Sequence, residues 1–191
     1  AETYFYPASG GQPAGWGTIN GRSVTDVTIR EADGAVVHWL AMDHWLPMDH
    51  WLPMDHWLAE PGRVTAETAT AVIDWPRRFD HMQHHTGEHI LSQAFIRAAG
   101  ADPLSFHLSE NSVTIDLDRS DLTPADVNAA EQLANHIVWE NRPVTVQFVS
   151  RAEAAELPLR KIPPAQNGRL RLINITDFDL TACGGTHVRH T

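Results

Sequence analysis

The sequence contains little cysteine, no long apolar run and little positive charge, and each shortage narrows the range of functions. Cys183 is the single cysteine among 191 residues. One thiol cannot form an internal disulfide, so we expect a reducing, cytoplasmic setting in which this thiol is free to bind a metal. Secreted domains that depend on internal disulfides are therefore excluded as a class.

Apolar residues are plentiful but dispersed. They make up 42% of the chain, yet none of their runs approaches the ~20 residues that a membrane-spanning helix needs. Charged residues account for 20%, which is ordinary for a globular protein and unlike a disordered one. We expect a folded protein without a membrane partner.

Basic residues are outnumbered. The chain has 14 lysines and arginines against 24 aspartates and glutamates, and its formal net charge is −10. Phosphate repels such a surface, so nonspecific coating of nucleic acid is excluded, whereas binding of one nucleic-acid end by a local basic patch is compatible with it. The alternative is that the basic residues are ordinary solvated charges. The clustered ones are Arg77 and Arg78, Arg160 and Lys161, and Arg169 and Arg171.

The first part of the chain has a strand pattern. Apolar and polar residues alternate or run in short apolar stretches over residues 23–31, 35–40 and 63–74, between turns that contain glycine and proline. We expect residues 1–76 to form a small antiparallel β domain, barrel-like in shape.

From residue 77 onward, helical and strand-like segments are interleaved. Residues 80–100 place apolar and histidine side chains at three- and four-residue steps and end at Gly100, which is typical of a helix and its stop. A second helix is expected after Thr123, an N-cap residue, with Pro124 in its first turn. Residues 77–191 are therefore predicted to form an α+β domain, so the chain as a whole belongs to the α+β class. Strands are expected at residues 111–118, 143–150 and 170–179, the last running directly into the segment around Cys183.

Residues 42–58 fit neither pattern, because they repeat the hexapeptide MDHWLP without drift. The recurring proline forbids a continuous helix. We interpret the repeat as an expanded loop between two strands, since loops tolerate insertion at small cost. Its histidines could bind metal, and its exposed tryptophans would offer an apolar surface for self-association.

Two pairs of metal-binding side chains have the same spacing. His85 and His89 are four residues apart in a helical segment and so share one face. Cys183 and His187 are also four apart, and the two glycines between them let the chain turn so that both side chains converge. Three imidazoles and one thiolate are a typical tetrahedral zinc set. From spacing alone, a buried thiol and hydrogen-bonded histidines explain the pattern equally well, and His81 is a rival ligand.

Acidic residues near these pairs suggest supporting roles. Glu88 stands directly before His89, whereas in metalloprotease helices the glutamate directly follows the first histidine and acts as the general base. We therefore expect Glu88 to point away from the metal, which argues against a protease. Asp177 and Asp179 are candidates to orient a ligand histidine.

Three segments together carry a family resemblance: TYFYPASGGQPAGWG, HTGEH and CGGTHVRHT. They resemble the editing domain of alanyl-tRNA synthetases and, more closely, the freestanding AlaX-type proteins that share this domain. The resemblance extends from Thr3 to Thr191 outside the repeat. It implies a small β-barrel with an S-G-G-Q loop, then an α+β domain that binds one zinc ion, and it implies that the chain is part of a longer protein. The implied zinc ligands are His85, His89, Cys183 and His187.

The resemblance also implies an activity. Members of this family hydrolyse the ester bond of mischarged tRNA(Ala), chiefly seryl-tRNA(Ala), at the acceptor end, and no ATP is expected to take part. Because four protein ligands close a tetrahedral ion, we expect zinc to bind and orient the substrate rather than to activate water. Two other functions remain open: a catalytically idle zinc-stabilised module that binds tRNA or a partner, and a hydrolase of small amino-acid esters.

Site residues are predicted in two groups. Substrate binding is assigned to Gly10, Gly11, Gln12 and Arg160, since glycine-rich turns let a backbone approach a ligand closely. Catalytic roles are assigned to Gln12, which would orient the amino acid or the water, and to Ser105 and His107, which could meet a seryl hydroxyl. A plain hairpin turn at the glycines, and structural roles for the serine and the histidine, are the alternatives.

Overall fold

The computed structural model describes residues 3–41, 68–109, 112–161 and 168–191. The MDHWLP repeat at residues 42–58, and with it the predicted self-association, lies outside the described residues.

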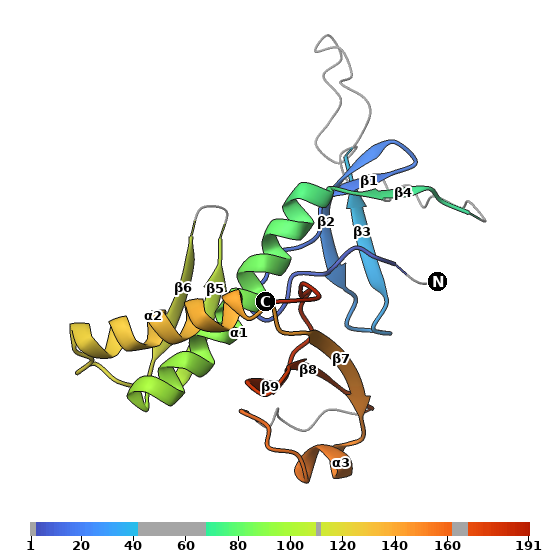
Figure 1. Ribbon diagram of the computed structural model, residues 1–191. Coiled ribbons are helices and arrows are strands. Elements are labelled where there is room, and N and C mark those ends of the chain that lie inside the picture. Colours follow the sequence, from blue (N-terminus) through green and yellow to red (C-terminus); the bar gives the residue numbers. More distant parts are fainter. Residues whose placement is uncertain (1–2, 42–67, 110–111, 162–167) are drawn as a thin grey trace.

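The first part of the chain forms a four-stranded antiparallel sheet in the order β3-β2-β1-β4 (Figure 1). Its small core consists of Phe5, Ala14, Val24 and Val27. Within the described residues β3 and β4 each pair with one neighbour only, so the sheet is open there and the predicted barrel-like closure is not confirmed. The strands are β1 (Gly17–Ile19), β2 (Arg22–Ile29), β3 (Val36–Leu40) and β4 (Ala71–Ile73).

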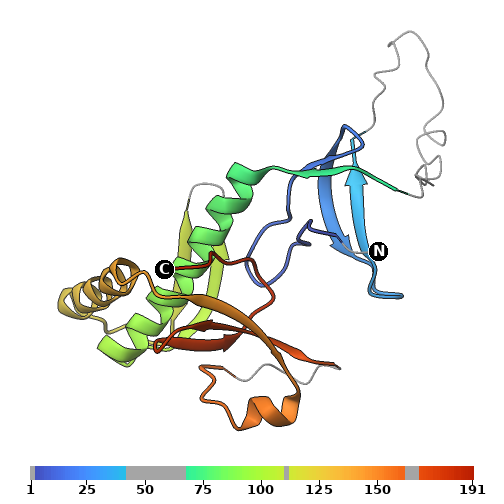
Figure 2. The ribbon, with the colours of Figure 1, turned by 45° about the vertical axis from the view of Figure 1, so that its right-hand side comes forward.

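A long helix, α1 (Trp75–Ala99), leads from this sheet into the rest of the molecule (Figures 1 and 2). The Asp74 side chain accepts a hydrogen bond from the Arg77 N–H, and a proline occupies the first turn. Gly100 ends the helix in the left-handed conformation at φ 60°, as predicted. The helix begins earlier than the predicted residue 80, and the predicted domain boundary after residue 76 falls in its first turn. The division into two domains remains a prediction.

The second helix, α2 (Pro124–Trp139), packs along α1 and covers the main core. Thr123 and Asp126 form a capping box, which confirms the predicted N-cap. The core between the two helices and the C-terminal sheet is fully apolar in its centre, where Ala94, Ala130 and Ile173 are inaccessible to solvent.

The C-terminal part is a three-stranded antiparallel sheet in the order β7-β8-β9. The prediction of one strand over residues 170–179 is wrong, because the chain turns between β8 and β9. Asp177 adopts φ 56° in that turn, and the Phe178 N–H bonds the Ile175 carbonyl at 2.9 Å. This hairpin returns the chain so that the Cys183 N–H donates to the Arg171 carbonyl at 3.1 Å. The elements are β7 (Val144–Val149), α3 (Arg151–Ala155), β8 (Leu170–Ile175) and β9 (Asp179–Ala182).

A separate hairpin of β5 (Pro103–Leu108) and β6 (Val113–Leu117) packs against α1 (Figure 2). Strand β5 was not predicted, because the first strand expected after Gly100 was at residues 111–118. The Leu108 N–H donates to the Gly11 carbonyl at 3.0 Å, which attaches the S-G-G-Q turn to this hairpin. Of the helices in the described ranges, none has both the length and the apolar character needed to cross a membrane.

Candidate metal centre

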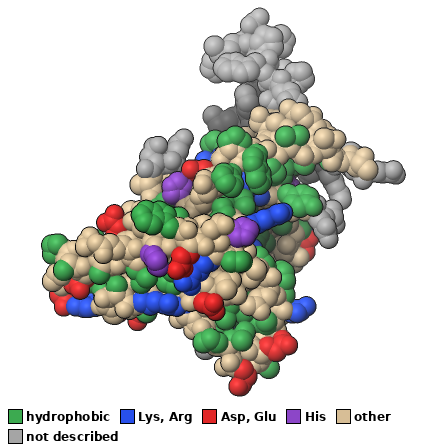
Figure 3. All heavy atoms as spheres, in the orientation of Figure 1, with side chains coloured by type: hydrophobic (Ala, Val, Ile, Leu, Met, Phe, Trp, Pro, Cys, Tyr) green, Lys and Arg blue, Asp and Glu red, His purple; other side chains and the backbone are tan. Residues whose placement is uncertain are grey.

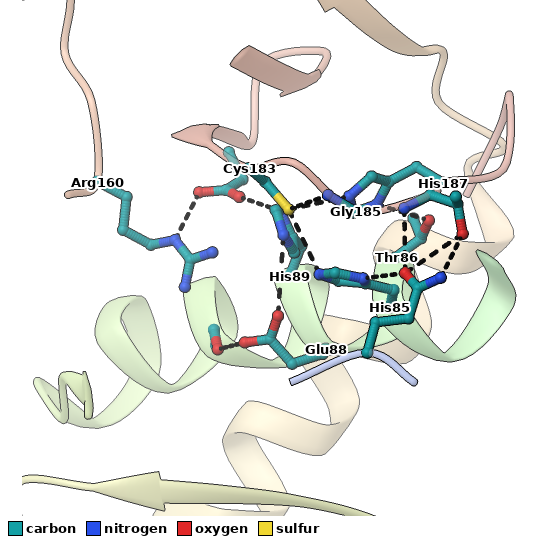
Figure 4. A network of polar contacts seen from close by, with 12 residues as sticks. His85, Thr86, Glu88, His89, Arg160, Cys183, Gly185 and His187 are labelled. Carbon is teal, nitrogen blue, oxygen red and sulfur yellow. Dashed lines mark hydrogen bonds and ion pairs between the residues drawn. The ribbon is translucent and has the colours of Figure 1, made fainter. Parts of the chain in front are cut away.

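Four side chains from two distant segments meet beside α1 (Figure 4). His85 and His89 project from the middle of the helix, and Cys183 and His187 follow β9. Their ligand atoms all lie within 4.8 Å of one another. The Cys183 Sγ is 3.4 Å from Nε2 of His85 and 3.4 Å from Nε2 of His187. His81, the rival, is buried on the same helix but is not part of this cluster. The four residues predicted together from two motifs therefore form one group that can hold a single metal ion.

Each of the three imidazoles has a protein contact at its other ring nitrogen, which is a hydrogen bond for His85 and His187 and a carboxylate at ion-pair distance for His89. A partner at Nδ1 holds the ring in one orientation and leaves Nε2 directed toward the cluster. The pairs are His85 Nδ1 with Gln12 Oε1 at 2.8 Å, His89 Nδ1 with Asp179 Oδ2 at 3.3 Å, and His187 Nδ1 with Thr86 Oγ1 at 3.2 Å.

Gln12 connects the S-G-G-Q turn to both halves of the cluster. Only 2% of the residue is exposed. Besides its contact with His85, its Oε1 accepts from the Thr186 N–H at 3.1 Å, and its Nε2 donates to the Thr186 hydroxyl at 2.9 Å. The amide is thus engaged with protein groups that hold the ligands in place. A direct role for Gln12 in catalysis remains a prediction.

The glycines of the S-G-G-Q turn form a tight, docked turn. Ser9 and Gln12 exchange two backbone hydrogen bonds of 3.1 and 3.0 Å, and Gly10 and Gly11 have φ values of 54° and 80°. These are the conformations of a two-residue hairpin turn. A Cβ at Gly11 would lie 2.4 Å from the Phe106 carbonyl oxygen, so the turn packs directly on β5. Substrate binding by these glycines stays a prediction.

In strand β5 the side chain of Phe106 contacts the cluster, whereas those of Ser105 and His107 contact Asp116 instead. The Phe106 ring packs against His85 with a centroid distance of 5.1 Å. Ser105 bonds Asp116, and His107 has its Nε2 3.8 Å from an Asp116 oxygen with 69% of its side chain exposed. The structure therefore does not bring Ser105 and His107 into contact with the four ligands, and their catalytic roles remain predictions.

Arg160 and Asp179 extend the support of His89. The Arg160 Nε is 3.0 Å from Asp179 Oδ1, and the two side chains are 11% and 0% exposed. Arg160, predicted to bind substrate, is thus engaged with the carboxylate that holds His89. Asp179 occupies the orienting position predicted for it, whereas Asp177 lies in the β8–β9 turn.

Glu88 does not point away from the cluster, so that prediction is wrong. Its Oε2 lies 3.8 Å from Nε2 of His89, and its Oε1 accepts from the Ser92 hydroxyl at 2.5 Å. The side chain is buried, with 8% exposed. The hydrogen bond to Ser92, one helical turn further along α1, holds the carboxylate against the helix on the side of the ligands.

Burial sets the protonation of the cluster. It lowers the pKa of His85 to about 4 and lowers the pKa values of His89 and His187 well below their ordinary value. Burial raises the pKa of the Cys183 thiol, against the opposing effect of the Gly185 N–H, which lies 3.3 Å from Sγ. The imidazoles are therefore neutral and ready to bind, while the thiol must release a proton when a metal enters.

Comparison with known proteins shows the family of the chain. The chain is 30% identical over 195 residues to the alanyl-tRNA editing protein AlaX-M of Methanosarcina acetivorans, an alignment that covers 99% of this chain and 76% of the relative. The chain belongs to the alanyl-tRNA editing protein family. It is also 31% identical over 189 residues to the alanyl-tRNA editing protein Aarsd1 of Danio rerio, and 30% identical over 198 residues to the alanine–tRNA ligase of Pyrococcus furiosus. No family model matches the chain.

This chain of the editing family covers different shares of the length of its relatives. It spans 41% of Aarsd1 and 20% of the ligase, and in each case nearly all of this chain is aligned. The resemblance inferred from the three sequence segments is thereby confirmed at the level of the family.

Sequence reasoning missed several residues of this editing-family site. Thr86 and Thr186 stand within the two ligand motifs and contact His187 and Gln12. Their positions beside ligands were the signal that could have identified them. Phe106 carries no such signal, because its contact with His85 depends on how β5 packs on α1.

Acid should destabilise the metal-free protein through the buried histidines. The pKa of His85 is about 4 against 6.5 for the unperturbed group, so between these values the unfolded chain binds the additional proton. This contribution is fully present above about pH 6.5 and is lost as the pH falls toward about 4. Urea unfolding in the presence of a chelator, at a series of pH values, measures the effect.

The control for this prediction is His85→Asn, in which the pH dependence over the same range should be shallower. Burial also raises the pKa values of Glu88 and Asp179, and this favours the folded state as the pH falls. That effect opposes the effect of the histidines and is present in both proteins. The difference between the two curves therefore isolates the histidine. Identical slopes would contradict the prediction.

Proposed function

We propose that the chain is a zinc-dependent deacylase that hydrolyses mischarged aminoacyl-tRNA(Ala), chiefly seryl-tRNA(Ala), in the cytoplasm. The observation that carries this proposal is the convergence of His85, His89, Cys183 and His187 in a chain whose length is aligned almost completely with editing proteins. One zinc ion would be held by these four residues.

The donor set and its spacing support zinc as the metal. Zn–N and Zn–S bonds of tetrahedral sites imply a separation of about 3.6 Å between a nitrogen and a sulfur ligand. The two measured Sγ–Nε2 separations are 3.4 Å. When bound, zinc would supply a positive centre that polarises a carbonyl or orients the ribose end of the substrate.

Several side chains would act as positioning residues. Gln12, Asp179 and Thr86 each fix one ligand histidine through its Nδ1, and Arg160 neutralises the buried Asp179. Loss of such outer partners commonly costs about 10- to 100-fold in metal affinity or activity. The site is therefore built as a preorganised unit that extends beyond the four ligands.

Contacts with tRNA are expected to be few and local. On the face shown in Figure 3, lysine and arginine side chains lie among aspartate and glutamate side chains rather than in one continuous patch. Near the start of α1, the Arg77 guanidinium lies 3.9 Å from the centre of the Trp16 ring, and Trp75 stacks on Phe79 at a centroid distance of 6.0 Å. These partly exposed rings and the arginine are suited to stacking with unpaired bases at the acceptor end.

Discrimination between serine and alanine would depend on the seryl hydroxyl. A site that hydrogen-bonds this hydroxyl rejects alanine because a buried polar partner is then left unpaired. A synthetase cannot exclude serine nearly as well by size, which is the physical reason for a separate hydrolytic site.

The zinc-loaded protein should deacylate seryl-tRNA(Ala), release alanine from alanyl-tRNA(Ala) much more slowly, and lose both activities in a chelator. Release of labelled amino acid from the two tRNAs, with metal content measured in parallel, tests this. Bound zinc without hydrolysis of either tRNA would defeat the deacylase proposal and favour a binding module. Hydrolysis of serine methyl ester but of neither tRNA would favour a small-ester hydrolase.

A further inference from the structure

Glu88 is an acidic residue beside the cluster that does not contact the Nδ1 atom of any ligand histidine. Its Oε1 is held by Ser92, while Oε2 accepts no hydrogen bond from any residue the structure describes and lies 3.8 Å from the metal-facing Nε2 of His89. Asp179, the other carboxylate near the cluster, lies at ion-pair distance from the cationic side chain of Arg160 and from Nδ1 of His89, and neither of its oxygens accepts a hydrogen bond from the described residues. Figure 4 shows the Glu88 carboxylate directed at His89 from the α1 side.

Glu88 also faces a cavity of about 450 Å³ between α1 and the β5–β6 hairpin. Among the residues that line this cavity, Glu88 is the single acidic one. Apart from Gln83, His84 and Gly87, the rest of the lining is apolar. Its apolar lining consists of Leu91, Phe95, Val113, Ile115 and Leu117. A carboxylate at the border between an apolar cavity and a metal cluster is placed to bind a small cationic group that enters with the substrate.

The positive charges around the cluster mean that the ammonium group of an aminoacyl ester needs a negatively charged partner to bind there. An aminoacyl ester carries an α-ammonium group next to the carbonyl that is attacked. Arg160 and Arg171 are close enough to the ligand histidines to oppose their protonation, and a zinc ion adds further positive charge. An ammonium group that approached this region without a carboxylate partner would be repelled.

Covalent geometry places the ammonium group within reach of Glu88. The α-nitrogen of an amino acid is about 2.5 Å from its carbonyl carbon, as the N–Cα and Cα–C bond lengths require. A carbonyl held at the cluster can therefore direct its ammonium group toward Glu88, whose Oε2 lies 3.8 Å from Nε2 of His89.

We propose that Glu88 binds the α-ammonium group of the aminoacyl ester and so selects substrates with a free amino group. This inference rests on the proposed deacylase function, whose substrate it describes further. It assigns Glu88 to substrate binding rather than to metal binding, and it predicts that an N-acylated aminoacyl-tRNA is a poor substrate.

Two stable probes test the assignment: serine joined to the adenosine ribose by an amide, and the same compound with its amino group acetylated. The zinc-loaded protein should bind the free amine about 10- to 100-fold more tightly, which is the value of a hydrogen bond to a charged group. Glu88→Gln should bind both probes about equally, because it retains an oxygen for Ser92 but has no charge. Calorimetry gives the dissociation constants.

Glu131→Gln, at an exposed position on α2, is the matched control and should keep the full preference. Metal content is measured in all three proteins, so that loss of zinc is not mistaken for loss of recognition. Retention of the preference in Glu88→Gln, or equal binding of both probes by the unaltered protein, would overturn the assignment. Failure of the unaltered protein to deacylate seryl-tRNA(Ala) would instead overturn the proposed function, so the two results are separable.

Discussion

Replacing His85 with asparagine should remove the metal ion and lower deacylation of seryl-tRNA(Ala) by more than about 100-fold. His85 is at the centre of the cluster: it faces the Cys183 Sγ at 3.4 Å, is held by Gln12 at 2.8 Å and packs on Phe106. Asparagine is too short to reach the same point. Metal content and initial deacylation rates measure the two losses.

The adjacent histidine provides the matched control. His84 is exposed, and its Nδ1 lies 3.0 Å from the Asp80 carbonyl oxygen on its own helix. His84→Asn should therefore retain stoichiometric metal and near-normal activity. Binding of metal to the folded form alone raises stability by about 4 kcal/mol at a thousandfold excess over Kd, so addition of zinc should raise the melting temperature of this variant but not that of His85→Asn. Equal responses in the two variants would rule out the proposed ligand set.

Gly185→Ala should disable the cluster, whereas Gly184→Ala should be tolerated. A Cβ at Gly185 would lie 2.1 Å from Cε1 and 2.4 Å from Nδ1 of His85. His85 cannot move away without losing its bond to Gln12 and its position beside Cys183. Overpacking of this kind costs about 1–3 kcal/mol in stability, and displacement of the ligand should reduce metal affinity by about 10- to 100-fold.

At Gly184 nothing lies within 4 Å of the added Cβ, so the same substitution should change stability by less than about 0.5 kcal/mol. Neither glycine has a positive φ, so backbone strain does not separate the two variants. Zinc titration and thermal unfolding of the pair provide the measurement. A Gly185→Ala protein that binds zinc as tightly as the Gly184→Ala protein would show that the close approach to His85 is not required.

Features that depend on near neighbours in the chain were predictable from the sequence. The N-cap at Thr123 and the stop at Gly100 were identified because capping involves groups within one helical turn. The shared face of His85 and His89 was also predictable, since helical periodicity alone places residues four apart together.

Two errors have a common cause. The last strand was predicted as continuous because its apolar pattern persists through Phe178, yet the chain turns at Asp177 and Phe178 packs in the main core. Glu88 was expected to point away from the metal on the basis of its position in the motif, whereas its hydrogen bond to Ser92 turns the carboxylate to the side of His89. In both cases a tertiary or side-chain contact outweighed the local pattern.

The sequence by itself determined the fold class, the two ligand motifs and, through the resemblance of three segments, the family. Only the tertiary structure decided that Gln12 holds His85, that the second glycine of the C-G-G-T-H segment must lack a side chain, and that Glu88 borders both the cluster and a cavity. The physical reason is distance along the chain: His85 and Cys183 are 98 residues apart, and Gln12 and Thr186 are 174 apart. Contacts over such separations depend on how the sheets and α1 pack together, and no local periodicity encodes that packing.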